Sequence, residues 1–137
     1  MPQRMPEPHL FEYAVIRLLP RVEREEFLNV GVILYCRGLR FLEARYFLQT
    51  DRLSASFPGL DLPLITQYLD AFTGIAAGLS AASPITKLDA ASRFRWLTAT
   101  RSTILQTSRV HPGRCSDPSL QLQHLMQTLV LPAGEQY

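Results

Sequence analysis

The sequence has few of the residues and motifs that identify a reaction. Its 137 residues include only two cysteines, Cys36 and Cys115, which are too few for a disulfide framework and lack the paired spacing of a zinc site. It has no phosphate-binding glycine loop, no dinucleotide-binding glycine motif, no nucleophile elbow and no zinc-protease helix motif. The common nucleotide-binding, hydrolase and zinc-enzyme classes are therefore not indicated, and we predict neither a cofactor nor a metal site.

Charge and hydropathy exclude further classes. The net charge of +2 is too small to mark the whole chain as a nucleic-acid-binding protein, so any basic footprint must be local. The longest apolar run, 62–82, is interrupted by Gln67 and Asp70 and has helical periodicity, which is not typical of a membrane span. The first eight residues include three prolines, and no apolar signal-peptide core follows them. We therefore expect a cytoplasmic protein without membrane contact.

The hydrophobic pattern predicts a single α+β domain at 10–131, between a lead-in at 1–9 and a tail at 132–137. Three segments have the β-branched and aromatic residues of strands: 11–19, 28–36 and 41–48. Three others have helical features: 51–56, 62–82 and 118–130. Asp61 and Asp117 are the expected caps of the two longer helices. We predict a small antiparallel sheet, made of a three-stranded meander and one or more strands from 93–111, with helices packed mainly on one face.

The register of the hairpin within 25–47 decides which side chains share a face. A two-residue loop at 37–38 would place Val32 opposite Glu43, whereas a three-residue loop at 37–39 would place Val32 opposite Ala44. We prefer the second register because it gives one apolar face, and we expect Gly38 to supply a positive φ. The opposite face would then hold four residues: Asn29, Gly31, Glu43 and Arg45.

One window of the sequence has no acidic residue at all. It lies between Asp89 and Asp117 and contains five arginines, so its local charge is +5 in a chain of net charge +2: Arg93, Arg95, Arg101, Arg109 and Arg114. The alternation Arg93-Phe94-Arg95-Trp96 predicts a strand that buries both aromatic rings and exposes both arginines. Arginine, serine and threonine without a competing carboxylate favour an anion site.

We therefore predict that this window and the polar face of the hairpin form one binding surface. Its residues would be Arg93, Arg95, Arg101, Ser102, Thr103, Thr107, Arg109, His111, Asn29 and Arg45. The alternative is structural, because the arginines could form ion pairs with acids of the hairpin region: Glu23, Glu25, Glu26 and Glu43. His111 is a weak candidate for acid–base catalysis, since it titrates near neutral pH but has no partner nearby in sequence.

The thiol of Cys115 is a second candidate for a reactive group. It precedes the predicted cap Asp117 by two residues, and a helix N-terminus lowers the pKa of a nearby thiol. An ordinary loop cysteine is the simpler interpretation of this position.

Two blocks in order, EFLNVGVILYC after a Tyr-Ala-Val-Ile-Arg strand and FRWLTATRSTILQTSRVHPG before an Asp-Pro-capped helix, resemble a bacterial family called domain of unknown function 3037. The similarity spans about residues 11–130. It brings no established activity and no catalytic residue. Members of this type are often encoded beside a HipA-like serine/threonine kinase, so the resemblance implies an accessory or regulatory partner of such a kinase in a toxin-type or defence-type system.

Three functional hypotheses follow. The first is a non-enzymatic interaction module that binds a partner protein, a HipA-like kinase being the partner that the resemblance implies. The second is nucleic-acid binding, with arginines on phosphate and Phe94 or Trp96 stacking on bases. The third is a phosphate-directed enzyme that uses Arg101, Arg109 and His111 from one concave pocket.

Overall fold

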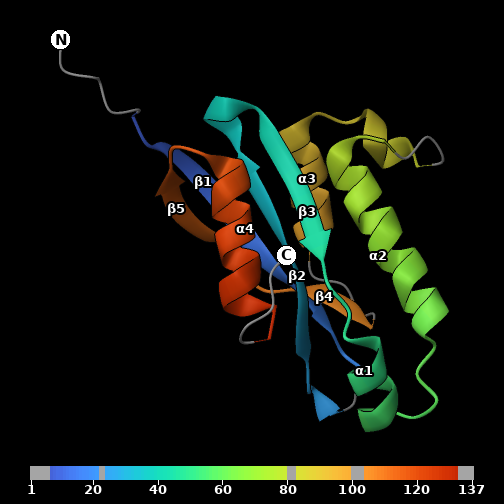
Figure 1. Ribbon diagram of the computed structural model, residues 1–137. Coiled ribbons are helices and arrows are strands. Elements are labelled where there is room, and N and C mark those ends of the chain that lie inside the picture. Colours follow the sequence, from blue (N-terminus) through green and yellow to red (C-terminus); the bar gives the residue numbers. More distant parts are fainter. Residues whose placement is uncertain (1–6, 22–23, 80–82, 100–103, 133–137) are drawn as a thin grey trace.

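The computed structural model describes residues 7–21, 24–79, 83–99 and 104–132. The strands are β1 (His9–Leu18), β2 (Leu28–Cys36), β3 (Phe41–Tyr46), β4 (Leu105–Thr107) and β5 (His111–Cys115). The α-helices are α1 (Thr50–Ser56), α2 (Leu62–Ala77), α3 (Ala90–Thr98) and α4 (Pro118–Leu129). Two short 3₁₀ helices, η2 (Arg37–Leu39) and η3 (Pro84–Lys87), complete these elements. The predicted α+β class is confirmed, including the meander and the later strands (Figure 1).

The first strand, β1, is the centre of the sheet. It pairs with β2 along one side, and β2 in turn pairs with β3. Along its other side β1 pairs first with β5 and then with β4, all antiparallel, so these two short strands follow one another along the same edge of β1. Every strand of the sheet therefore depends directly or indirectly on β1.

A buried serine bridges the gap between β4 and β5. The backbone N–H of Ser108 donates to the carbonyl of Val15 at 2.8 Å, and the Ser108 hydroxyl accepts from the Val15 N–H at 2.9 Å. The same hydroxyl donates to the Arg109 carbonyl at 2.9 Å. Ser108 is the one buried polar residue among the described residues, and its hydroxyl satisfies a backbone donor that the ladder leaves unpaired at this position.

The predicted hairpin register is wrong. Cys36 pairs with Phe41, so the connection has four residues, and Val32 lies opposite Arg45 rather than opposite Ala44. The connection begins with η2 and closes through Arg40, which has φ +53°; the expected positive φ at Gly38 is absent. A helical turn uses one residue more than a bulged three-residue loop, and this extra residue shifts every cross-strand pair.

Both faces of the sheet are covered, and an irregularity in β2 distributes its side chains between them. Ile16 pairs with Gly31 and Arg17 with Asn29, so Val30 is an extra residue in β2. Val30 packs on the face covered by α1, α2 and α3, whereas Val32 packs on the face covered by α4. Three of the four described α-helices thus lie on one face, as predicted, and α4 lies on the other (Figure 1).

The caps of the two longer helices are where the sequence places them. The Asp61 carboxylate accepts from the Leu64 N–H, and the Asp117 carboxylate accepts from two N–H groups of the first turn of α4. The helix α2 ends at Ala77, before a left-handed Gly78, and not near residue 82 as predicted. Leu79 therefore lies outside the helix and is 80% exposed. No helix in the described ranges is long and apolar enough to cross a membrane.

The segment predicted as a strand at Arg93–Trp96 is helical. Asp89 caps α3 through the Ser92 N–H, and the side chains of Phe94 and Leu97, three positions apart, are both buried. The expected burial of Phe94 and exposure of Arg95 are confirmed, but in a helix and not in a strand. The expected burial of Trp96 and exposure of Arg93 are not, because both side chains are only partly buried. The aspartate cap and two apolar residues three positions apart favour a helix here. The alternation of arginine and aromatic residues, which favours a strand, extends over only four positions and does not outweigh them.

Candidate functional site

The arginines of α3 have intramolecular partners. Arg95 forms a two-point ion pair with Glu12 of β1, with N–O distances of 2.9 and 3.0 Å. Arg93 donates to the Leu88 carbonyl at 2.6 Å, and its Nε is buried without a hydrogen-bond partner among the described residues. The structural alternative therefore holds for Arg95, although the acid is Glu12 and not one of the acids expected from the hairpin region.

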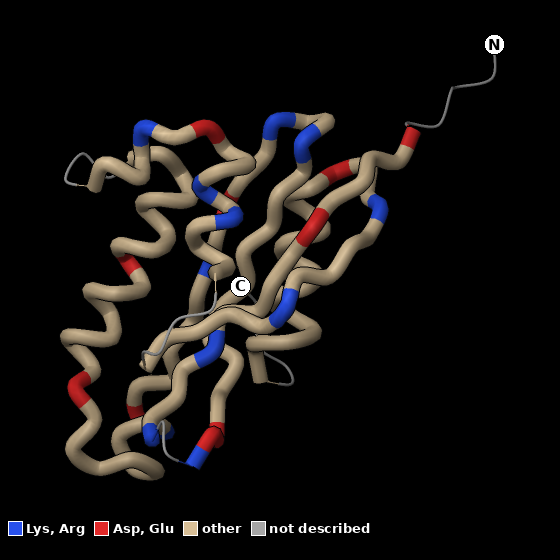
Figure 2. Tube along the Cα trace, turned by 180° about the vertical axis from the view of Figure 1, so that it is seen from behind, with Lys and Arg blue, Asp and Glu red and all other residues tan. Residues whose placement is uncertain are grey.

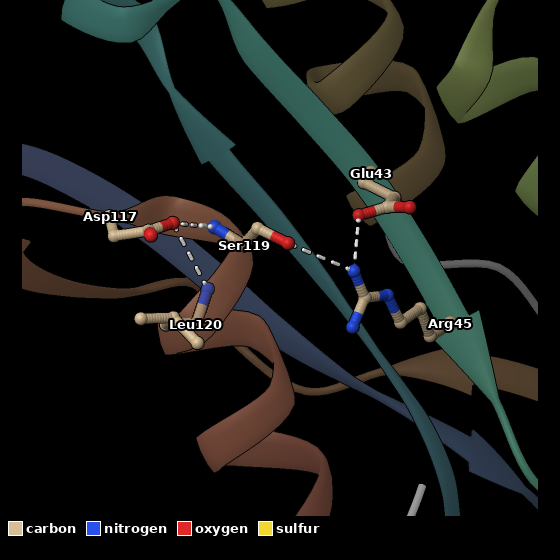
Figure 3. Close-up of polar contacts among 5 residues, drawn as sticks. All are labelled: Glu43, Arg45, Asp117, Ser119 and Leu120. Carbon is tan, nitrogen blue, oxygen red and sulfur yellow. Dashed lines mark hydrogen bonds and ion pairs between the residues drawn. The ribbon is translucent and has the colours of Figure 1, made fainter.

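The predicted polar face of the hairpin is not formed. Glu43 and Arg45 lie on the α4 side of the sheet, where Arg45 pairs with Glu43 at 3.0 Å and donates to the Ser119 hydroxyl at 3.3 Å (Figure 3). Asn29 is also on this side, because its amide donates to the Leu129 carbonyl of α4. Gly31 pairs with Tyr46 on the other face. The four residues expected on one polar face are therefore divided between the two faces of the sheet.

The acid-free window is divided in the same way. The Thr107 hydroxyl donates to the Thr98 carbonyl of α3, on the α2–α3 side of the sheet. The ring of His111 stacks on Tyr13, with centroids 5.3 Å apart, and Tyr13 packs with the cluster under α4. Arg109 lies between these strands and is exposed, while Arg101, Ser102 and Thr103 lie outside the described residues. As far as the described residues go, the window and the hairpin therefore do not meet as one surface.

The main cavity near this window is apolar. It has a volume of about 550 Å³ and opens between α2, α3 and β4, on the sheet face opposite α4. Its main side chains are Ile16, Tyr68, Phe72, Ile75, Trp96 and Leu105. Neither Arg109 nor His111 lines it, so it is not the arginine–histidine pocket that an enzyme of this type would need.

The residues that form this cavity were only partly recognisable. Trp96 and Thr107 belong to the window that the sequence singles out, whereas no motif marks Tyr68 and Phe72 of α2 as site residues. Tyr68 is in fact 47% exposed at the edge of the cavity. A signal was present, because Leu64, Tyr68 and Phe72 follow one another at i, i+4 spacing along α2.

The two cysteines are buried thiols. Burial is the largest of the causes that together raise the pKa of Cys115 to about 11; the nearby Cys36 thiol and then the Asp117 carboxylate contribute in the same direction. The lowered pKa considered from the sequence is therefore wrong. Cys115 ends β5 with its side chain packed in the α4-side cluster, so desolvation outweighs any effect of the helix N-terminus.

At pH 8 the Cys115 thiol is expected to react with iodoacetamide at least about 100-fold more slowly in the folded protein than in 8 M urea. A pKa of about 11 instead of 9.0 leaves about 100-fold less thiolate, and burial slows access further. Mass spectrometry of the peptide that contains Cys115 follows the alkylation of this thiol separately while Cys36 stays in place. Equal rates in the folded and the urea-unfolded protein would contradict the assignment.

Comparison with known proteins gives one positive result. Residues 13–130 match the family described as "Protein of unknown function (DUF3037)". The chain belongs to this family. No curated protein and no solved structure matches it. The region of the DUF3037 match begins inside β1 and ends directly after α4, so it contains the whole apolar cavity and both faces of the sheet.

Proposed function

We propose that this DUF3037 protein is a non-enzymatic interaction module that binds a partner protein through the apolar cavity between α2, α3 and β4. The observation that carries the proposal is the cavity itself, because about 550 Å³ of space lined by aromatic and aliphatic side chains suits a buried apolar anchor. No charged side chain from the described part of the window lines it, which favours binding over chemistry.

The surface beside the cavity favours a macromolecule over a small ligand. Leu64 and Tyr68 of α2 are 38% and 47% exposed, so apolar surface continues along the helix beyond the cavity. Tyrosine and tryptophan at such a rim are the residues that most often carry binding energy in protein interfaces. A contiguous apolar surface of this kind on a soluble domain is typical of an interaction site.

The partner to test first is a HipA-like kinase, which the family resemblance implies through genomic association. This role would make the protein an accessory or regulatory subunit of a toxin-type or defence-type system. The contact would bury an apolar anchor of the kinase between Phe72 and Trp96.

Filling the cavity should abolish binding to such a kinase. Ala71 is an exposed residue of α2 that lines the cavity, so Ala71→Phe is expected to weaken co-purification with the co-expressed kinase at least about tenfold. Ala77 is exposed on the same helix outside the cavity, and Ala77→Phe should leave the amount of captured kinase unchanged. Unchanged capture by Ala71→Phe, with the fold intact by circular dichroism, would contradict the proposal.

The nucleic-acid alternative has less support. Lys and Arg positions are spread over several elements and are interspersed with acidic positions, as the trace in Figure 2 shows. A phosphate backbone is bound by a continuous basic stripe, and such binding weakens steeply with salt. Salt-sensitive capture of DNA or RNA, insensitive to Ala71→Phe, would favour this alternative over the interaction module.

A further inference from the structure

The strand β3 forms an open edge of the sheet. Among the described strands it pairs with β2 alone, and it lies between α4 and α2 in the view of Figure 1. Its residues, Phe41–Tyr46, include no proline or glycine and pair with β2 without a break. The opposite edge consists of the short strands β4 and β5, where Pro112 has no N–H donor. A further strand is therefore accepted more readily at β3 than at the other edge.

Alternate residues of β3 direct their backbone groups away from β2. The N–H of Phe47, directly after β3, donates to the Val30 carbonyl at 2.7 Å, so the odd-numbered residues of β3 form the hydrogen bonds to β2. The backbone groups of Leu42 and Ala44 therefore point to the outer edge, where they have no hydrogen-bond partner among the described residues. A shallow groove of about 540 Å³ lies beside this edge, lined by residues 43–46 and by Thr73 of α2. The groove leaves space for a further strand.

We propose that β3 pairs with β3 of a second copy of this chain, antiparallel and centred on Ala44. In this register Ala44 lies opposite the partner's Ala44, Glu43 opposite the partner's Arg45, and Leu42 opposite the partner's Tyr46. Residues that point outward then face each other, as the hydrogen bonds of an antiparallel ladder require. The two contacts of Glu43 with Arg45 join opposite charges on the α4 side, and the two contacts of Leu42 with Tyr46 join apolar and aromatic side chains on the other side.

The charges of β3 favour this register over its neighbours. A two-fold axis at Glu43 would place the two Glu43 carboxylates opposite each other, and an axis at Arg45 would do the same to the two guanidiniums. Like charges directly opposite in neighbouring strands are destabilising. Within one copy Arg45 pairs with Oε2 of Glu43 at 3.0 Å (Figure 3). The other carboxylate oxygen, Oε1, has no partner among the described residues, and the Glu43 side chain is 40% exposed, so Oε1 is available to the partner's Arg45.

A charge swap, measured by sedimentation equilibrium of the full chain, tests this pairing. Glu43→Arg and Arg45→Glu each place like charges across the interface, so each variant alone should dimerise at least about tenfold more weakly than the wild type. An equimolar mixture of the two variants restores both contacts between opposite charges and should form a heterodimer. Glu7→Arg makes the same change of charge at an exposed position before β1, and it should leave dimerisation unchanged.

Recovery in the mixture cannot come from the contact of residues 43 and 45 within one copy, because each variant chain still holds two like charges there. If either variant does not fold, Glu43→Gln, which keeps the shape of the side chain, should still weaken the dimer. In the wild type, hydrogen exchange of the Ala44 N–H should slow as the protein concentration rises.

Three results would overturn the proposal: a wild type that is monomeric at every concentration, a Glu43→Arg variant that dimerises as well as Glu7→Arg, or a mixture without heterodimer. Protection of the Ala44 N–H only on addition of an extended peptide from another protein would also overturn it, because the edge would then bind a different chain. The pairing is separate from the proposed kinase contact, since Ala71 lies in the apolar cavity and not beside β3. Ala71→Phe should therefore leave the dimer unchanged.

Discussion

Replacing Phe94 by alanine is expected to lower the free energy of unfolding by about 3–5 kcal/mol. The ring is 0% exposed and lies in the main core cluster, with its centroid 5.4 Å from that of Tyr35 on β2. It is the largest fully buried side chain among the described residues and the principal anchor of α3 on the sheet. Removing it would leave a cavity that neighbouring rigid elements close only partly.

Urea denaturation followed by circular dichroism measures this loss. The matched control is Arg95→Ala, one position further along α3, which breaks the exposed ion pair with Glu12 but leaves the core intact. That change should cost less than about 1 kcal/mol, since solvent screens a pair of this kind. A Phe94→Ala variant as stable as Arg95→Ala would show that α3 is not packed as described.

Local signals in the sequence were sufficient for most elements. Asp61 and Asp117 each precede a proline in the first turn of a helix, and both caps are formed because they depend only on neighbouring residues. The same kind of signal was present for α3, in Asp89 and the spacing of Phe94 and Leu97. The alternation of arginine and aromatic residues over four positions was too short to decide between a strand and a helix.

The register and the candidate sites depend on information that no local segment contains. The extra residue Val30 changes the face of every side chain before it in β2, and it is visible only when β1 and β2 are paired. The apolar cavity requires three separate elements to pack around it.

Gly31 is where the hairpin tolerates least change. A Cβ at this position would meet the backbone carbonyl oxygen of Arg45, with Ile16 Cδ1 at 3.0 Å and Tyr46 Cβ at 3.1 Å. The backbone oxygen belongs to the paired strand β3, so it moves only if β2 and β3 separate. We expect Gly31→Ala to destabilise the protein by about 1–3 kcal/mol, because this overlap outweighs the gain of less than about 1 kcal/mol from a less flexible unfolded chain.

The control for Gly31→Ala is Gly38→Ala in the connection between the same two strands. A Cβ at Gly38 would meet the imidazole of His9 at 2.7 Å, and this ring is the end of a flexible side chain that is free to rotate away. Gly38→Ala should therefore change the midpoint of thermal unfolding by no more than a few degrees, whereas Gly31→Ala should lower it clearly. Equal midpoints for the two variants would mean that β2 and β3 are not as closely apposed at Gly31 as the pairing of Gly31 with Tyr46 requires. The hairpin register would then have to be reconsidered, and with it the assignment of Arg45 to the α4 side of the sheet and of Tyr46 to the other side.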